Sequence, residues 1–215
     1  MQANMAVPLI ELLNHADGEA MLFLNSFNHT SLDQLMYTLS GRFTWVPFYI
    51  FLFVLIVRRF GWRKALLSLL FIALTILLAD KLCNNLLRPM IGRLRPACLD
   101  NPLSRWIHIV NEYRGGRNGF PSCHAANSFA LAVYLIRTMR WRGYVMAAIL
   151  VWAVLIAYTR IYLGVHYPGD VIVGGLIGSA IAYGTSTLFI RRDALRAVAV
   201  KVWTALPFPW RSTRA

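Results

Sequence analysis

The chain has 215 residues, of which 58% are hydrophobic and only 14% are charged, and its formal net charge is +13. A soluble domain carries about 25% charged residues, so this composition indicates a membrane protein and excludes a disordered chain. Three cysteines are too few for a disulfide scaffold. The basic excess fits loops beside membrane spans better than a nucleic-acid surface, so no nucleic-acid partner is expected.

The first 42 residues precede the first long apolar run and lack the basic start of a signal peptide. Their apolar residues recur at roughly helical spacing, at Leu9, Leu12, Leu13, Ala16, Ala20, Phe23 and Phe27. This pattern predicts an amphipathic helix in the membrane interface, within an N-terminal segment of residues 1–42. We expect no catalytic role for this segment.

Five later stretches are apolar enough to form membrane helices, since about 20 residues cross a hydrocarbon core of about 30 Å. They are residues 43–58, 65–87, 122–140, 143–162 and 170–190. The sequence therefore predicts an all-α fold, a polytopic transmembrane bundle of five or six spans. Residues 43–190 would form the transmembrane domain and residues 191–215 a basic cytoplasmic tail.

Basic residues set the expected orientation of the bundle. The segments after the first, third and fifth spans hold 13 of the 22 lysines and arginines. The positive-inside rule places these segments in the cytoplasm. Residues 88–121 and 163–169 would then lie on the outer side, which we expect to be the periplasmic side of a bacterial inner membrane.

Three arginines lie at the outer ends of the spans, where the positive-inside rule does not account for basic residues. Arg88 and Arg95 follow the second span, and Arg160 lies near the end of the fourth. Arginines at membrane depth are costly and commonly mark a ligand path, and guanidinium groups match phosphate oxygens. These residues predict a phosphate site on the outer side.

Two histidines accompany the arginines. A helix beginning at Ser122 would direct free backbone N–H groups at an anion. Neutral His166 could attack phosphorus while Asp170, four residues later, holds its other ring nitrogen, and His124 could protonate the leaving oxygen. Because the arginines supply positive charge and no carboxylate cluster lies on this side, no metal or other cofactor is expected.

These residues form three ordered motifs that resemble those of the type 2 phosphatidic acid phosphatase and vanadium haloperoxidase superfamily. The family motifs run Lys-x6-Arg-Pro, Pro-Ser-Gly-His and Ser-Arg-x5-His-x3-Asp, and the segments here are residues 88–96, 121–124 and 159–170. The resemblance implies a phosphohistidine mechanism with His166 as nucleophile, Asp170 as its partner and His124 as acid. It also implies phosphate binding by Arg88, Arg95, Ser122, Cys123 and Arg160.

The chain departs from the family motifs at three positions. Arg88 replaces lysine, Cys123 replaces glycine and Thr159 replaces serine. The Cys123 side chain would narrow the pocket, since glycine allows close backbone approach. A second alignment, from Lys81 to Arg88 and the following proline, matches the first motif literally. We prefer the later frame because Lys81 directly follows Asp80, a local charge partner.

The leading functional hypothesis is an integral membrane phosphatase that acts on a lipid phosphate or diphosphate. By family analogy alone, undecaprenyl diphosphate is the first substrate to consider, and phosphatidylglycerophosphate, phosphatidic acid and lipid A 1-phosphate are alternatives. A second hypothesis is a phosphoryltransferase that passes phosphate from His166 to another acceptor. A third is a lipid carrier or channel that binds the anion without cleaving it, which the two histidines and Asp170 argue against.

Overall fold

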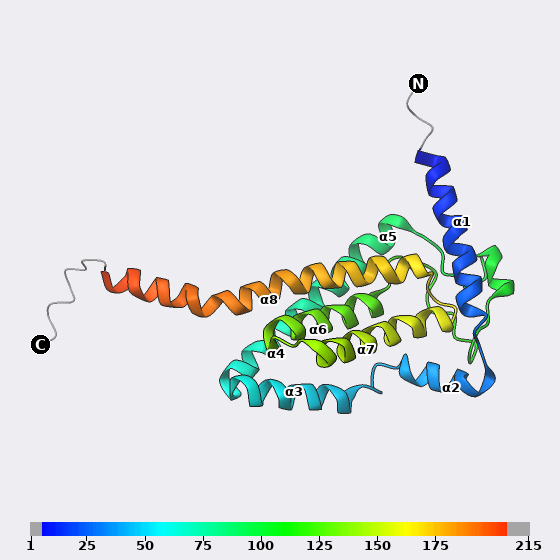
Figure 1. The fold of residues 1–215 in the computed structure, drawn as a ribbon. Coiled ribbons are helices and arrows are strands. Elements are labelled where there is room, and N and C mark those ends of the chain that lie inside the picture. Colours follow the sequence, from blue (N-terminus) through cyan, green and yellow to red (C-terminus); the bar gives the residue numbers. More distant parts are fainter. Residues whose placement is uncertain (1–5, 206–215) are drawn as a thin grey trace, which may run out of the picture.

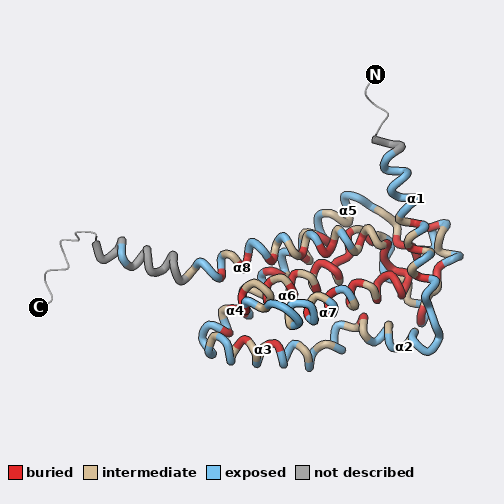
Figure 2. Tube along the Cα trace, in the orientation of Figure 1, coloured by how far each residue is buried: buried red, intermediate tan, exposed pale blue. Residues whose placement is uncertain are grey.

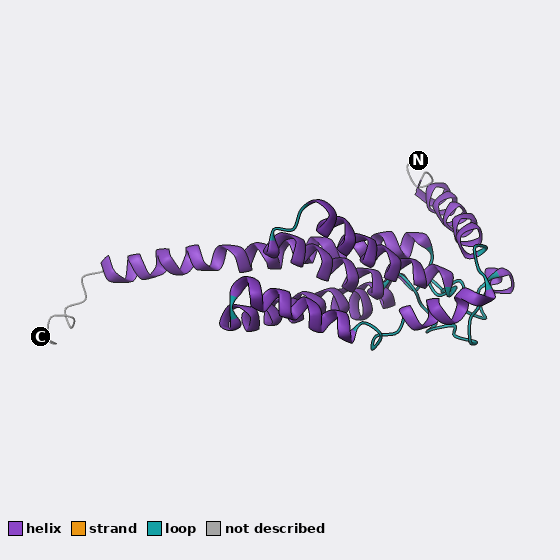
Figure 3. Ribbon diagram, turned by 60° about the horizontal axis from the view of Figure 1, so that its bottom comes forward, coloured by secondary structure: helices purple, strands orange, loops and turns teal. Residues whose placement is uncertain are grey.

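The computed structural model describes the backbone of residues 6–205 and the side chains of residues 9–192 and Lys201. Over this range every named element is a helix, and the loops between the helices contain one isolated β-bridge, between Leu94 and Asn118 (Figure 3). The all-α fold predicted from the sequence is therefore confirmed. Residues 206–215, the end of the predicted basic tail, lie outside the described range.

The N-terminal segment forms two helices, α1 (Ala6–Asn25) and α2 (Thr30–Leu39). The break between them follows from capping, because the ring of His29 accepts a hydrogen bond from the backbone N–H of Ser31 and starts α2. In Figure 1, α1 lies across one end of the bundle. Its apolar side chains are largely exposed, including Leu9, Leu12, Leu13 and Phe23, and so is Phe27 just beyond its end.

Helices α3 (Val46–Phe60) and α4 (Trp62–Asp80) form a tight hairpin. Gly61 joins them with a φ of 75°, a left-handed conformation that favours glycine. Beyond α4 the helix continues without a break as a π-helical segment, η1 (Lys81–Leu87), and then as α5 (Arg88–Ile91). π-Helical turns are rare and commonly mark functional sites, and this one ends directly before Arg88.

A loop of residues 92–122, which includes the short 3-10 helix η2 (Pro102–Trp106), leads to α6 (Cys123–Met139). Helices α7 (Gly143–Tyr162) and α8 (Pro168–Ala205) complete the described chain. Within the described residues, three helical stretches are long and apolar enough to cross a membrane, namely Trp62–Ile91, α7 and Pro168–Arg192. Since α3 and α6 have 15 and 17 residues, the predicted count of five spans stays a prediction.

Close packing of α6 against α8 positions the two segments that carry site residues. A Cβ atom on Gly174 or Gly178 would collide with the backbone carbonyls of Ser122 or Ala126, so only glycine permits this approach. These two glycines therefore allow the backbones of α6 and α8 to lie close together. Figure 2 shows buried residues throughout this region and the adjoining loops. The contact brings the start of α6 next to the start of α8.

Candidate active site

The predicted arginines and histidines meet in one cavity of about 750 Å³. Its polar end is lined by Arg88, Arg95, Cys123, His124, Arg160 and His166. Its other end is apolar and lies between α3, α4, α6 and α7, with Leu52, Ile56, Leu69, Ile72, Leu131 and Leu135 among the lining residues. One cavity therefore joins a basic pocket to a hydrophobic channel.

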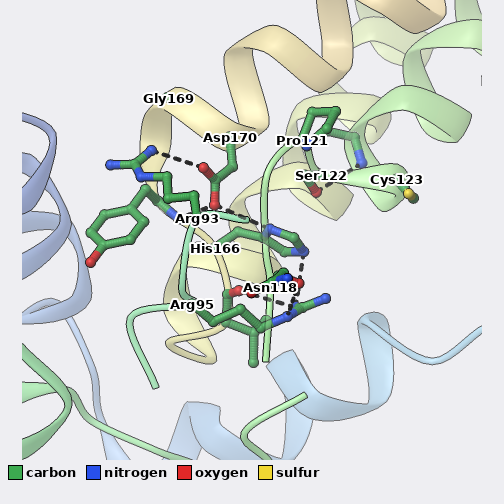
Figure 4. Close-up of polar contacts among 12 residues, drawn as sticks. Arg93, Arg95, Asn118, Pro121, Ser122, Cys123, His166, Gly169 and Asp170 are labelled. Atoms are coloured by element: carbon green, nitrogen blue, oxygen red, sulfur yellow. Dashed lines mark hydrogen bonds and ion pairs between the residues drawn. The ribbon is translucent and has the colours of Figure 1, made fainter. Parts of the chain in front are cut away.

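His166 and Asp170 form the centre of the polar end. His166 lies in the turn after α7, whose tight path is fixed by hydrogen bonds from the backbone N–H groups of Val165 and His166 to the carbonyl of Arg160, 3.1 and 3.2 Å long. The Nδ1 atom of His166 lies 3.3 Å from Oδ2 of Asp170, and both residues are almost completely buried (Figure 4). Asp170 therefore holds the Nδ1 edge of the imidazole ring.

The tautomer of His166 follows from its second contact. Nε2 lies 3.1 Å from Nη1 of Arg95. Arginine can only donate hydrogen bonds, so Nε2 must accept and the proton of the neutral ring sits on Nδ1, facing Asp170. The lone pair of Nε2 therefore points toward the cluster of arginines, where phosphate would bind.

Charge and burial both keep the His166 ring neutral. Burial lowers the pKa of His166 well below its usual range, and repulsion from Arg95, Arg160 and Arg88 lowers it further. The Arg95 guanidinium is also affected, because burial and the same neighbouring arginines bring its pKa to about 10. At neutral pH the site therefore combines an unprotonated histidine with charged guanidinium groups.

Arg95 is held rigidly beside His166. Its Nε donates to the carbonyl of Asn118 and its Nη1 to the carbonyl of Val165, both at 3.1 Å. Gly115 and Gly119 leave room for it, since a Cβ on either would lie 3.0 Å from an Arg95 side-chain atom. Arg95 is only 7% exposed and keeps one face toward the cavity.

Arg88 enters the cavity from the end of η1. It donates to Oδ1 of Asn84, to the carbonyl of Pro121 at 3.2 Å and to Sγ of Cys123 at 3.2 Å. Lys81 is exposed and does not line the cavity, so the geometry agrees with the frame that pairs Arg88 with Arg95. The Cys123 side chain, present where the family has glycine, lies against the Arg88 guanidinium.

Arg160 reaches the cavity from the last turn of α7. It donates to the hydroxyl of Ser40, which follows α2, and to the hydroxyl of Tyr113 at 3.2 Å. Neither Ser40 nor Tyr113 could be singled out from the sequence, because both contacts join segments far apart in the chain. These hydroxyls fix the direction of the guanidinium.

Ser122 has a different place from the predicted one. Its hydroxyl accepts from the backbone N–H of Ala125 at 3.4 Å, which caps α6, and it is completely buried and does not line the cavity. Its backbone N–H donates to the carbonyl of Asp170 at 2.9 Å. The predicted start of this helix is confirmed within one residue, and His124 in its first turn lines the cavity.

Arg93 and Asp17 belong to the same network, although neither is a named position of the three motifs. Arg93 Nη1 lies 2.9 Å from Oδ1 of Asp170 and 2.7 Å from Oδ2 of Asp17 on α1. Arg93 stands two residues before Arg95, and this closeness in the sequence could have indicated that Arg93 also lies near the site. Asp17 carried no such signal, because it is 152 residues away in the chain from Gly169, at the start of α8, which it also contacts.

The fold and this cavity define a class of helical membrane proteins that gather arginines and histidines for phosphate chemistry. Among the described residues, no group of three or more His, Cys, Asp or Glu side chains is arranged to hold a metal ion. The positive charge available to an anion in the cavity comes from Arg88, Arg95 and Arg160, and Arg42 also lines it.

Comparison with known proteins agrees with this class. Residues 64–194 match the family model of the PAP2 superfamily, so the chain belongs to that superfamily and is a membrane phosphatase of lipid phosphates. It is 45% identical over 170 residues to a lipid A 4'-phosphatase of Bacteroides thetaiotaomicron, covering 79% of this chain and 75% of the relative. A lipid A 4'-phosphatase of Porphyromonas gingivalis is 32% identical, with coverage of 81% and 73%.

A solved structure is also similar. The crystal structure of Aquifex aeolicus LpxE superposes with a TM-score of 0.56 and 28% sequence identity, covering 78% of this chain and 92% of that one. The family match begins within α4 and leaves out α1, α2 and α3. The N-terminal helices therefore add contacts, such as that of Asp17, beyond the matched region.

Proposed function

We propose that this protein removes a phosphate group from lipid A, with the 4'-phosphate as the first candidate, through a covalent phosphohistidine. The observation that carries the proposal is the single cavity that joins the arginine cluster of Arg88, Arg95 and Arg160 and the two histidines to an apolar channel. A phosphate ester on a lipid has the same two parts. Similarity to two proteins named lipid A 4'-phosphatase supports this choice of lipid.

In the first step, the Nε2 lone pair of His166 attacks phosphorus and the bond from phosphorus to the lipid oxygen breaks. Asp170 keeps the proton on Nδ1 and stabilises the positive charge that develops on the ring. Arg88, Arg95 and Arg160 neutralise the equatorial oxygens, where phosphoryl transfer gathers its charge.

His124 provides the proton in this scheme. It lines the same cavity from the first turn of α6 and would protonate the departing lipid oxygen. In the second step it would take a proton from water, which attacks the phosphohistidine and releases inorganic phosphate. The same residue thus serves as acid and then as base.

Undecaprenyl diphosphate, the first choice from the motifs alone, becomes the alternative substrate. Family motifs report the chemistry at phosphorus and say little about the leaving group, whereas similarity over about four-fifths of the chain includes the segments that line the channel. We also propose that the site faces the outer side of a bacterial inner membrane, because the basic loops lie at the opposite ends of the helices.

A substrate panel tests the proposal. Purified protein is incubated with bisphosphorylated lipid A, undecaprenyl diphosphate, phosphatidylglycerophosphate and phosphatidic acid, and mass spectrometry identifies which phosphate is lost. We expect loss of the 4'-phosphate with stoichiometric release of free phosphate. Retention of both phosphates on lipid A together with fast cleavage of undecaprenyl diphosphate would reverse the order of the two substrates.

The same experiment distinguishes hydrolysis from transfer. Phosphate that appears on a second lipid instead of in solution would identify a phosphoryltransferase. His166→Ala serves as the inactive variant, and His15→Ala, on the exposed face of α1, is its matched control. Normal turnover by His166→Ala would overturn the phosphohistidine mechanism.

A further inference from the structure

Arg93 links the catalytic centre to the N-terminal helix. Its Nη1 atom lies 2.9 Å from Oδ1 of Asp170 and 2.7 Å from Oδ2 of Asp17. The three side chains are 20%, 0% and 15% exposed, so bulk water screens the network only weakly. Figure 4 shows Arg93 on the far side of Asp170 from the His166 ring.

Asp17 also binds the start of α8. Its Oδ1 accepts from the backbone N–H of Gly169 at 2.7 Å, which places a carboxylate from α1 at the positive end of the α8 dipole. A Cβ on Gly169 would lie 2.6 Å from Asp17 Oδ2, so the contact requires glycine there. Asp17, in α1, therefore caps α8, a helix that is far from it in the sequence.

The geometry leaves Asp170 little freedom. Its Oδ2 faces Nδ1 of His166 and accepts from the backbone N–H of Tyr167 at 3.0 Å, while its Oδ1 is taken by Arg93. The guanidinium of Arg93 in turn stacks on the Tyr167 ring, 3.9 Å from its centroid. Every contact of the carboxylate thus depends on Arg93 or on the turn that Arg93 packs against.

We propose that Arg93 and Asp17 are positioning residues for the reaction at His166, and that α1 is thereby part of the catalytic unit. Arg93 orients the Asp170 carboxylate and offsets part of its charge, and Asp17 limits how much of that charge Arg93 offsets. This inference rests on the proposed role of His166 as nucleophile. Neither residue is assigned by the three family motifs, and Asp17 lies outside the region matched by the family model.

Opposite changes in pH dependence follow from this arrangement. Only the neutral form of His166 attacks phosphorus, so the acid limb of kcat/KM reports its protonation. The Asp170 charge favours the protonated ring, and Arg93 opposes it. Arg93→Gln should therefore move the acid limb to higher pH. Asp17→Asn leaves the charge of Arg93 to act on Asp170 alone, so the acid limb of kcat/KM should move to lower pH.

The groups that face His166 directly stay unchanged in both variants. They are Arg88, Arg95, His124, Arg160 and Asp170, with Tyr113 beside Arg160. Each shift should be about half a unit to one unit, since the effect of Arg93 and Asp17 reaches the ring through one carboxylate. General damage to the fold would lower activity in both variants without moving the limb in opposite directions.

The experiment measures phosphate release from the lipid that wild-type protein cleaves best, from pH 9 down to the lowest pH at which the protein stays folded, because the pKa of His166 lies well below its usual range. We expect Arg93→Gln to lose about 10- to 100-fold in kcat, the range seen when partners of metal-bound histidines are removed, with KM changed much less. Asp17→Asn should lose less, and Asp17→Glu should recover part of the loss. Asp100→Asn and Arg117→Gln break an exposed ion pair in the same loop region and are the matched controls.

Arg93→Ala adds a second test, in which the same variant is compared with and without added guanidinium, so that a general loss of folded protein does not affect the comparison. Guanidinium ion at millimolar concentration should restore part of its activity by filling the place of the side chain. Acid limbs that coincide with wild type in Arg93→Gln and Asp17→Asn, with no rescue by guanidinium, would overturn the positioning role. Turnover by His166→Ala would instead overturn the proposed mechanism, so the two failures are distinguishable.

Discussion

Replacement of Arg95 by lysine tests how much the site depends on a guanidinium fork. The Arg95 side chain donates to the carbonyls of Asn118 and Val165 and also faces Nε2 of His166. A lysine ammonium is a single point and cannot span these positions and a phosphate oxygen together. At least one buried carbonyl would lose its partner, which costs about 1–3 kcal/mol in stability.

The cost to catalysis should be larger than the cost to stability. Loss of one aligned donor to the transition state costs about 2.7–4 kcal/mol, so kcat should fall about 10²- to 10³-fold. The assay is phosphate release from lipid in detergent micelles, with the melting temperature measured on the same preparation. Arg117→Lys, an exposed arginine in the same loop, should behave like wild type. A kcat for Arg95→Lys within about threefold of wild type would refute the reasoning.

Three further predictions concern chemistry and topology. His124→Ala should slow cleavage of a phosphate monoester more than cleavage of a diphosphate lipid, whose leaving group is a weaker base, and equal losses in kcat would count against His124 as the acid. Turnover should persist in a chelator and be inhibited by vanadate, which adopts a five-coordinate geometry like the transition state; activity restored only by added magnesium would contradict this. In a cysteine-free background, an impermeant thiol reagent should label a cysteine at Arg105 in intact cells, and labelling at Arg63 instead would reverse the orientation.

Local patterns in the sequence were enough to predict much of the bundle. The predicted span at residues 143–162 coincides with α7, Gly143–Tyr162, because a long apolar run with clear ends has few other structures open to it. The π-helical turn before Arg88 was not predicted, since the polar pair Asn84 and Asn85 carries no signal of helix type. That turn nevertheless decides which face of the helix presents Arg88.

In the candidate site, too, some residues could be predicted from the sequence and others could not. Motif spacing predicted that Arg88, Arg95, Arg160 and the two histidines would meet, and the structure places them in one cavity. Ser122 was expected to bind phosphate, whereas its hydroxyl caps its own helix, because the capping bond is formed within the turn. Asp17 could not be predicted, since its partners are set by how α1 crosses the bundle.

The depth of the cavity bears on how the substrate is supplied. Its lining extends along α6 from His124 to Leu135, about 16 Å at the rise of a helix, or half of a hydrocarbon core of about 30 Å. An acyl chain bound there would stay within one leaflet throughout the reaction. The rate should then depend on the mole fraction of substrate in that leaflet and not on its bulk concentration. Adding inert lipid at constant substrate and enzyme should therefore slow turnover in proportion to dilution of the surface.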